Sequence, residues 1–90
     1  MKTITLHELL SVALELNNDS IRDILKINIQ EGYTINSKLK ISEYSNNPDI
    51  PGFTAWTSNY VYFPFAINDG DGGYDITCVP RNPNNDIIFP

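Results

Sequence analysis

The sequence has little of several residue types on which disulfides, metal sites and catalytic sites depend. It contains one cysteine, one histidine, one tryptophan and one methionine in 90 residues. A single cysteine excludes an internal disulfide bond and leaves no second thiolate for a structural zinc site. No apolar run approaches the roughly 18 residues of a membrane span, and no secretory signal pattern opens the chain. We therefore expect a cytoplasmic protein that has no membrane partner.

Positive charge is scarce in the second half of the chain. Residues 45–90 contain one basic residue, Arg81, against five acidic residues, and the whole chain has a net charge of −5. Such a surface repels phosphate backbones, so we expect no nucleic-acid partner. It favours a basic protein partner, although acidity also serves the solubility of a small protein by itself.

Length and periodicity predict one domain that begins with a helix. A chain of 90 residues with 41% hydrophobic residues has enough apolar material for one core, so we expect a single domain over residues 1–90. Thr5 and Glu8 form the pattern of a capping box, and leucines and alanines follow at helical spacing. This pattern predicts an amphipathic helix over residues 5–17.

A second start signal follows directly. Ser20 and Asp23 repeat the spacing of a helix start, and isoleucines and a leucine share one face after them, which predicts a second helix over about residues 20–29. Residues 26–30 also alternate between apolar and polar side chains, as a strand does. An end of the helix at Leu25, followed by extended chain, therefore stays open.

Alternating patterns and turn residues predict strands in the rest of the chain. The expected strands are residues 38–44, 53–67, 74–79 and 86–89. The Asp- and Gly-rich segment 68–73 predicts a hairpin loop between the second and third of them. Pro64 cannot donate to a ladder, so we expect its strand to be an edge or to be bulged there. The resulting fold class is α+β, with two N-terminal helices packed on a three- to four-stranded antiparallel meander.

The aromatic run contains residues for both the core and the surface. If Phe63, Phe65 and Ile67 face inward, strand alternation turns Tyr60, Tyr62 and Pro64 outward. A helix that covers this outward face is the alternative. The residues expected to line the core are Leu9, Leu10, Ala13, Ile24, Leu25, Phe63 and Phe65.

We expect a partner-binding surface made of aromatic and acidic side chains. Tyrosine and tryptophan dominate interface hot spots, and carboxylates at the rim steer a basic partner. The residues expected to bind the partner are Asp69, Asp71, Asp75, Tyr60, Tyr62, Tyr74 and Trp56. The oligomeric state stays open, because an unpaired strand edge also permits association through strand pairing.

The sequence offers weak support for metal binding or catalysis. An EF-hand-like calcium loop that begins at Asp69 would have Gly73 and Pro80 at positions where oxygen ligands are needed. His7 is expected on the helix surface, and Cys78 is expected as a small buried apolar residue. We therefore expect no cofactor, no bound metal and no enzymatic activity, and a metal-dependent hydrolase that uses the loop aspartates is the weakest alternative.

Residues 61–90, VYFPFAINDGDGGYDITCVPRNPNNDIIFP, resemble the central hairpin of the SUKH superfamily, which contains cell-wall assembly regulators and many bacterial immunity proteins. The matching segments are Phe63-Pro64-Phe65-Ala66, Asp69 to Gly73, Tyr74 to Val79 and Ile87-Ile88-Phe89. Members usually carry a Leu-Pro turn between their opening helices, and this sequence has no Leu-Pro. The resemblance implies an immunity protein that binds and neutralises a cognate toxin, often a nuclease. A regulatory or scaffolding interaction module that binds no toxin is the alternative.

Overall fold

The computed structural model describes residues 2–41, 48–66 and 74–81. Within these residues the fold is α+β, as predicted, with one α-helix and two antiparallel sheets. The elements are β1 (Thr3–Thr5), α1 (Leu6–Glu15), the single 3₁₀ turn η1 (Ile21–Asp23), β2 (Lys26–Ile29), β3 (Lys38–Lys40), β4 (Phe53–Trp56), β5 (Tyr60–Ala66) and β6 (Tyr74–Pro80).

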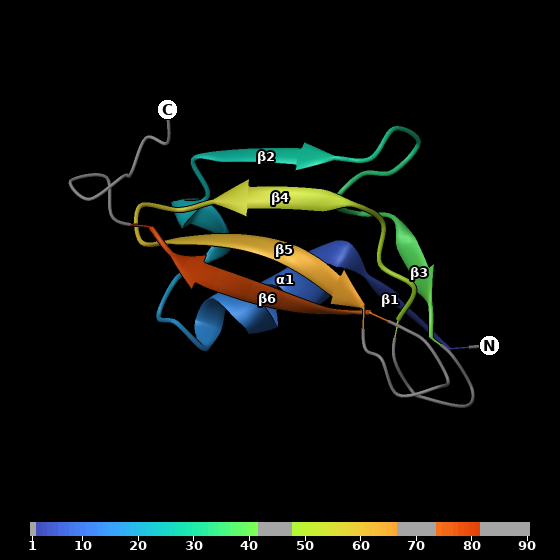
Figure 1. Ribbon diagram of the computed structural model, residues 1–90. Helices are drawn as coiled ribbons and strands as arrows, with labels where there is room; N and C mark the ends of the chain where they lie inside the picture. Colours follow the sequence, from blue (N-terminus) through green and yellow to red (C-terminus); the bar gives the residue numbers. More distant parts are fainter. Residues whose placement is uncertain (1, 42–47, 67–73, 82–90) are drawn as a thin grey trace.

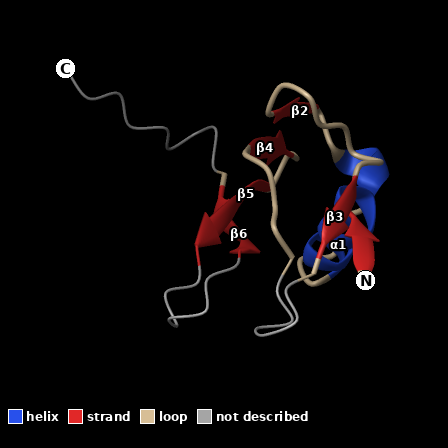
Figure 2. Cartoon of the chain, turned by 90° about the vertical axis from the view of Figure 1, so that its right-hand side faces the viewer, coloured by secondary structure: helices blue, strands red, loops and turns tan. Residues whose placement is uncertain are grey.

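The strands form one large and one small sheet. The large sheet has the order β2-β4-β5-β6, and β1 pairs with β3 in the small sheet. Figure 1 shows α1 behind strands β5 and β6. From the side, α1, β1 and β3 all lie on one side of the large sheet (Figure 2). One face of the large sheet is therefore covered by the helix layer, and no element of the described ranges 2–41, 48–66 and 74–81 covers the other face.

Helix α1 begins as the sequence predicts. The Thr5 hydroxyl accepts a hydrogen bond from the Glu8 backbone N–H at 3.1 Å, and the Glu8 carboxylate accepts one from Thr5 N–H at 3.4 Å. The next free N–H groups, of Leu6 and His7, donate to backbone carbonyls of the segment before β3. These bonds satisfy donors that a helix start leaves without intrahelical partners. The helix ends at Glu15, two residues before its predicted last residue Asn17, and the turn that follows reaches Asn18, whose φ of 60° lies in the left-handed region.

The predicted second helix is wrong. Its start signal is present, because the Asp23 carboxylate accepts hydrogen bonds from the backbone N–H and the hydroxyl of Ser20, but only one 3₁₀ turn follows. Ile24 is already extended, and residues 26–29 pair with β4 along their whole length. The alternating pattern of residues 26–30 therefore outweighs the helix-start signal, and a strand forms. β-Branched side chains favour this outcome because they lose less freedom in a strand than in a helix.

Part of the predicted meander is present as β4, β5 and β6, whereas its first strand, β3, pairs with β1 in the small sheet instead. The aromatic run is also divided differently, because the chain turns between β4 and β5 and residues 53–66 form two strands rather than one. The Thr57 hydroxyl accepts hydrogen bonds from the N–H groups of Asn59 and Tyr60, which fixes this turn. The predicted strand 38–44 is confirmed over β3, and the loop 68–73 and the strand 86–89 lie outside the described residues.

The core lies between α1 and the covered face of the large sheet. The buried apolar residues are Leu6, Leu10, Leu14, Leu39, Ile50, Phe53, Ala55 and Tyr62. Leu9, Ala13 and Ile24 pack against this cluster, as predicted. Three assignments are corrected: Leu25 is 66% exposed, Phe65 is 43% exposed, and Phe63 is half-buried outside the core cluster. Tyr62, which we expected on the surface, has no exposed area.

Within the described residues no helix is both long enough and apolar enough to span a membrane.

We expect Leu10→Ala to lower the free energy of unfolding by about 2–5 kcal/mol, because the leucine is fully buried under the large sheet. Urea denaturation measures this loss. Val12→Ala is the matched control on the exposed side of the same helix, and we expect it to change stability by less than about 0.5 kcal/mol. Equal losses in the two variants would contradict the assignment of the helix face.

Candidate protein-binding face

Strand pairing identifies the residues on the face of the large sheet that α1 does not cover. Residues directly opposite one another in an antiparallel ladder point to the same face. Lys26 pairs with Trp56, Trp56 pairs with Val61, and Val61 pairs with Val79, so these four side chains form one row across all four strands. The neighbouring row through Ile27, Ala55 and Tyr62 contains buried side chains and therefore faces the helix.

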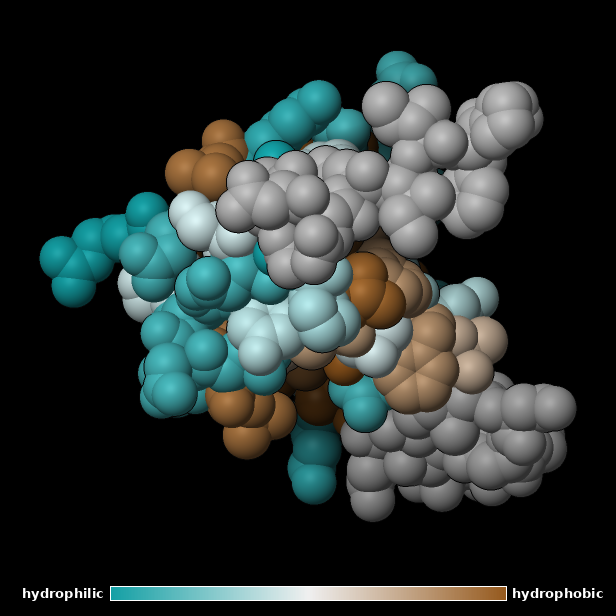
Figure 3. All heavy atoms as spheres, turned by 60° about the vertical axis from the view of Figure 1, so that its left-hand side comes forward, coloured by the Kyte–Doolittle hydropathy of each residue, from teal (hydrophilic) through white to brown (hydrophobic). Residues whose placement is uncertain are grey.

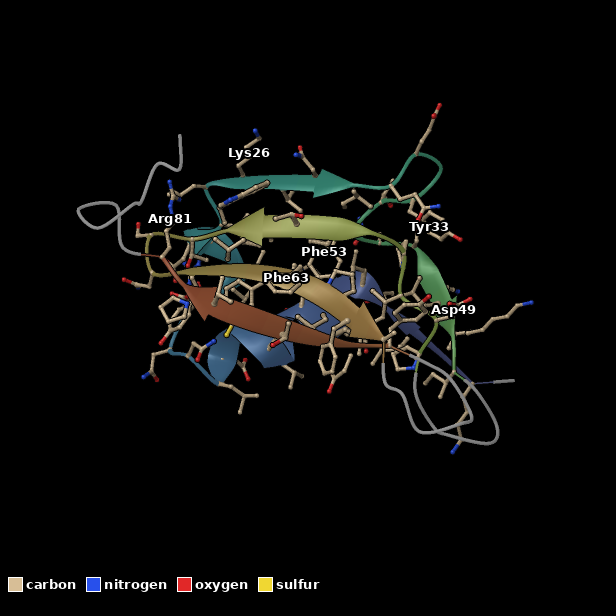
Figure 4. All side chains as sticks on the ribbon, viewed as in Figure 1. Lys26, Tyr33, Asp49, Phe53, Phe63 and Arg81 are labelled. Carbon is tan, nitrogen blue, oxygen red and sulfur yellow. The ribbon has the colours of Figure 1, made fainter. Side chains whose placement is uncertain are left out.

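The uncovered face, which we call the open face, is rich in aromatic and β-branched side chains. Its residues are Lys26, Asn28, Thr54, Trp56, Val61, Phe63, Phe65, Asp75, Thr77 and Val79. Phe65 is 43% exposed and Val79 is 46% exposed. Figure 4 views the sheet from this side, with Lys26 and Phe63 labelled. In the oblique view of Figure 3, hydrophobic side chains gather at the right, beside the grey residues.

Lys26 and Trp56 form a cation–π pair at one corner of the open face. The Lys26 ammonium lies 5.3 Å from the centroid of the Trp56 ring. The pair is possible because the two residues are directly opposite in the β2–β4 ladder. The contact favours this orientation of the half-buried Trp56 ring by about 0.5–1 kcal/mol.

A groove divides the open face where β5 leaves β4. The β4–β5 ladder contains only the pairs Ala55–Tyr62 and Trp56–Val61, whereas β5 continues along β6 to Ala66. A groove of about 550 Å³ lies beyond these pairs and is lined by residues of β2, β4 and β5. Figure 1 shows β5 bending away from β4 at this end.

Pro64 explains why the ladder stops. Thr57 N–H donates to the Tyr60 carbonyl, so the backbone groups of Tyr60 face β4. Strand alternation turns the backbone of Pro64 to the same side, where it has no N–H to donate. The expectation that the strand of Pro64 is an edge is wrong, because β5 lies between β4 and β6, although β5 has no β4 partner at Pro64 itself.

Asp75 partly blocks the edge of β6 that faces away from β5, where no described strand pairs. By the same alternation, Ile76 turns its backbone N–H away from β5 toward this edge. The Asp75 carboxylate oxygen Oδ1 accepts a hydrogen bond from that N–H at 2.8 Å. A negative charge that occupies an edge donor opposes the addition of another strand. This contact favours binding through the open face over strand pairing at this position.

A buried polar network lies on the other side of the sheet. The Tyr62 hydroxyl donates to Asp19 Oδ2 at 2.7 Å, and the Thr57 hydroxyl donates to the same oxygen at 2.9 Å. Asn17 donates from its amide nitrogen to the Tyr62 hydroxyl oxygen at 3.2 Å and to Cys78 Sγ at 3.1 Å. The network joins the segment after α1 to strands β5 and β6 and to the turn between β4 and β5, and no described buried side-chain N or O atom lacks a partner.

Burial raises the pKa of the Tyr62 hydroxyl well above its ordinary value of 10.0. The hydrogen bond and the negative charge of Asp19 act in the same direction, because both disfavour a tyrosinate next to a carboxylate. The hydroxyl therefore stays protonated and remains a donor throughout the neutral range.

The structure separates the seven residues that we expected to bind a partner. Trp56 and Asp75 lie on the open face, whereas Tyr60, Tyr62 and Tyr74 are on the helix-facing side of their strands. Tyr60 is half-buried beside Tyr62, with the ring centroids 6.1 Å apart, and Tyr74 is exposed at the end of β6. The expected outward orientation of Tyr62 is wrong because its hydroxyl has a buried acceptor. Asp69 and Asp71 lie outside the described residues.

Sequence reasoning missed Phe63 and Phe65 as surface residues. No local signal separates the two faces of β5, because both consist of apolar or aromatic side chains. The residue that decides between them, Asp19, is 43 positions away from Tyr62. The polar segment Asn17-Asn18-Asp19 after the helix was the available signal, since it supplies partners for a buried hydroxyl. His7 is exposed as predicted, and Cys78 is half-buried within the network.

Comparisons with protein-family models, with curated proteins and with solved structures find no match. The resemblance of residues 61–90 to the SUKH superfamily therefore stays a prediction.

We expect Tyr62→Phe to lower the free energy of unfolding by about 1–3 kcal/mol, because it removes one of the two hydroxyl donors to the buried Asp19 carboxylate. Chemical denaturation measures the loss. Tyr60→Phe removes the same atom from the neighbouring half-buried ring, and we expect a smaller loss. If the Tyr60 variant loses as much as the Tyr62 variant, the bond to Asp19 contributes nothing specific.

We expect the protein to lose stability above about pH 10 through Tyr62. Because the pKa of Tyr62 is higher in the folded protein than in the unfolded chain, its contribution is complete below the unfolded pKa and is lost as pH rises past it. Titration of the tyrosinate absorbance should show a resistant tyrosine in the parent that is missing in Tyr62→Phe. Above pH 10 the free energy of unfolding should fall more steeply in the parent than in Tyr62→Phe, and parallel curves would refute the prediction.

Proposed function

We propose that this chain is a cytoplasmic immunity protein that binds a cognate toxin domain through the open face and thereby neutralises it. The observation that supports binding is the uncovered row of Trp56, Val61 and Val79, next to Phe63 and Phe65, on a sheet whose other face is covered by a helix. Contiguous apolar surface of this kind is typical of interaction sites.

The composition of the open face is that of an interface core. Aromatic residues are enriched in interfaces, and charged residues are depleted at their centres. Here Lys26 and Asp75 lie on the two outermost strands, β2 and β6, and the residues between them are neutral. The groove beside Phe63 adds a concave feature that a protruding side chain of the partner can fill.

The kind of partner follows from charge and from the resemblance. A net charge of −5 attracts a basic protein over long range and accelerates its association. Nuclease toxins carry basic surfaces because they bind phosphates, so an acidic inhibitor can compete for that surface. The resemblance of residues 61–90 to immunity proteins supports the same partner. A module that binds a partner other than a toxin is the alternative.

The test uses the protein encoded by the gene next to this one as the partner. We expect the two proteins to bind each other and the chain to protect cells that express the partner. Trp56→Ala and Phe63→Ser should each weaken binding by about 30-fold or more, as the loss of a hot-spot residue does. Calorimetry measures the affinity, and growth of the co-expressing cells measures the protection.

Leu16→Ser is the matched control, because Leu16 is an exposed apolar residue at the end of α1. We expect it to change the affinity by less than about twofold. Thermal melts of all variants separate loss of binding from loss of folding. Parent-like binding by folded Trp56 and Phe63 variants would remove the open face from the interface, and binding without protection would support the non-toxin module instead.

A further inference from the structure

One corner of the open face combines an aromatic ring with a carboxylate. Phe65 and Asp75 are directly opposite in the β5–β6 ladder, which brings their Cβ atoms to about 5 Å and turns both side chains to the same face. Phe65 is 43% exposed and Asp75 is also exposed. The ring and the carboxylate are therefore both available to one incoming group.

The Asp75 carboxylate is oriented by the strand itself. Its Oδ1 accepts the hydrogen bond from Ile76 N–H at 2.8 Å, which uses one oxygen and limits rotation of the group. The second oxygen, Oδ2, accepts no hydrogen bond from the described residues, so a donor of another molecule can reach it. A carboxylate that is already fixed loses little conformational freedom when a cation binds it.

At the opposite corner of the open face, a cation of the chain itself lies over an aromatic ring. There the Lys26 ammonium lies 5.3 Å from the Trp56 ring centroid. Among the described residues of the open face, Lys26 is the one basic residue, and it is on β2, at the far edge of the sheet from Asp75 on β6. The Phe65 corner thus has a π-face and a negative charge, and its cation must come from another molecule.

We propose that the Phe65–Asp75 corner binds an arginine side chain of the protein partner, with the guanidinium stacked on the Phe65 ring and donating to Asp75 Oδ2. This inference rests on the proposed function. A planar guanidinium stacks on a ring and hydrogen-bonds along its edge at the same time, whereas an ammonium is a strongly hydrated point charge. The methylene groups of the arginine would lie over Phe63 and Thr77, the next row of the open face.

The test uses a defined probe, the tripeptide acetyl-Gly-Arg-Gly-amide, with the lysine tripeptide for comparison. Titration followed by amide chemical shifts in the ¹⁵N-labelled protein should place the largest changes at Phe65, Asp75 and their neighbours. We expect Asp75→Asn to lower the affinity for the arginine peptide by about threefold, and Phe65→Leu to lower it by about twofold. The lysine peptide should bind the parent about twofold more weakly than the arginine peptide.

The variants keep the fold while changing one interaction each. Asparagine retains an Oδ1 that accepts from Ile76 N–H, and leucine retains an apolar side chain without the π-face. Glu15→Gln is the matched control for charge, because Glu15 is exposed at the end of α1 in the layer on the other side of the large sheet. It should leave the affinity within about 1.5-fold of the parent, as screening of a distant charge implies.

Two results would overturn the inference. Equal losses in Asp75→Asn and Glu15→Gln, or shift changes centred elsewhere, would mean that the peptide responds only to net charge. A parent that sediments as a dimer, with monomers in both Asp75→Asn and Lys26→Gln, would assign the corner to Lys26 of a second copy. Either result leaves the proposed function standing if Trp56→Ala and Phe63→Ser still weaken binding of the toxin partner by about 30-fold or more, and the two proposals therefore fail separately.

Discussion

The hydrogen bond from the Tyr62 hydroxyl to the buried Asp19 carboxylate determines which face of β5 is inside the protein. Its length of 2.7 Å and the complete burial of the tyrosine fix the orientation of that strand. Because side chains alternate along a strand, a rotation that moved Tyr62 out of the core would turn all the remaining side chains of β5 to the opposite face as well. Phe63 and Phe65 point outward, onto the open face, because the Tyr62 hydroxyl bonds to Asp19 on the inner side.

The packing around Tyr62 shows why the core accepts a large polar ring. Its cross-strand neighbours are Ala55 on β4 and Cys78 on β6, both small, so the ring has room beneath α1. The chain that leaves α1 then places Asn17 and Asp19 beside the hydroxyl. Without a hydrogen-bond partner, the buried Tyr62 hydroxyl would lower stability by about 1–3 kcal/mol. With its partners, it links the segment after α1 to the sheet. A phenylalanine could fill the same space but would have nothing to donate to Asp19.

The parts of the structure that sequence patterns predicted are those fixed by neighbours in the chain. The Thr5–Glu8 capping box depends on contacts within a few positions and was predicted correctly, and α1 ends at Glu15, two residues before its predicted last residue. The prediction of a second helix was wrong. The helix-start contact between Ser20 and Asp23 forms, but residues 26–29 gain more from pairing with β4 than from continuing a helix. The orientation of β5 could not be read locally, since both of its faces are apolar and its determinant is 43 residues away. Of the expected partner-binding residues, Trp56 and Asp75 reached the open face, while the tyrosines did not.

The two faces of the large sheet therefore differ in how their side chains are satisfied. On the covered side, every described buried polar side-chain atom has a partner, as a stable core requires. On the open side, Pro64 ends the β4–β5 ladder and leaves a groove, and exposed aromatic and valine side chains remain without a covering element. A small domain has little stability to spare, so an uncovered apolar row is costly unless another surface buries it. Under the function proposed above, a basic protein partner would supply the surface that completes the sheet, and binding would cover the open face.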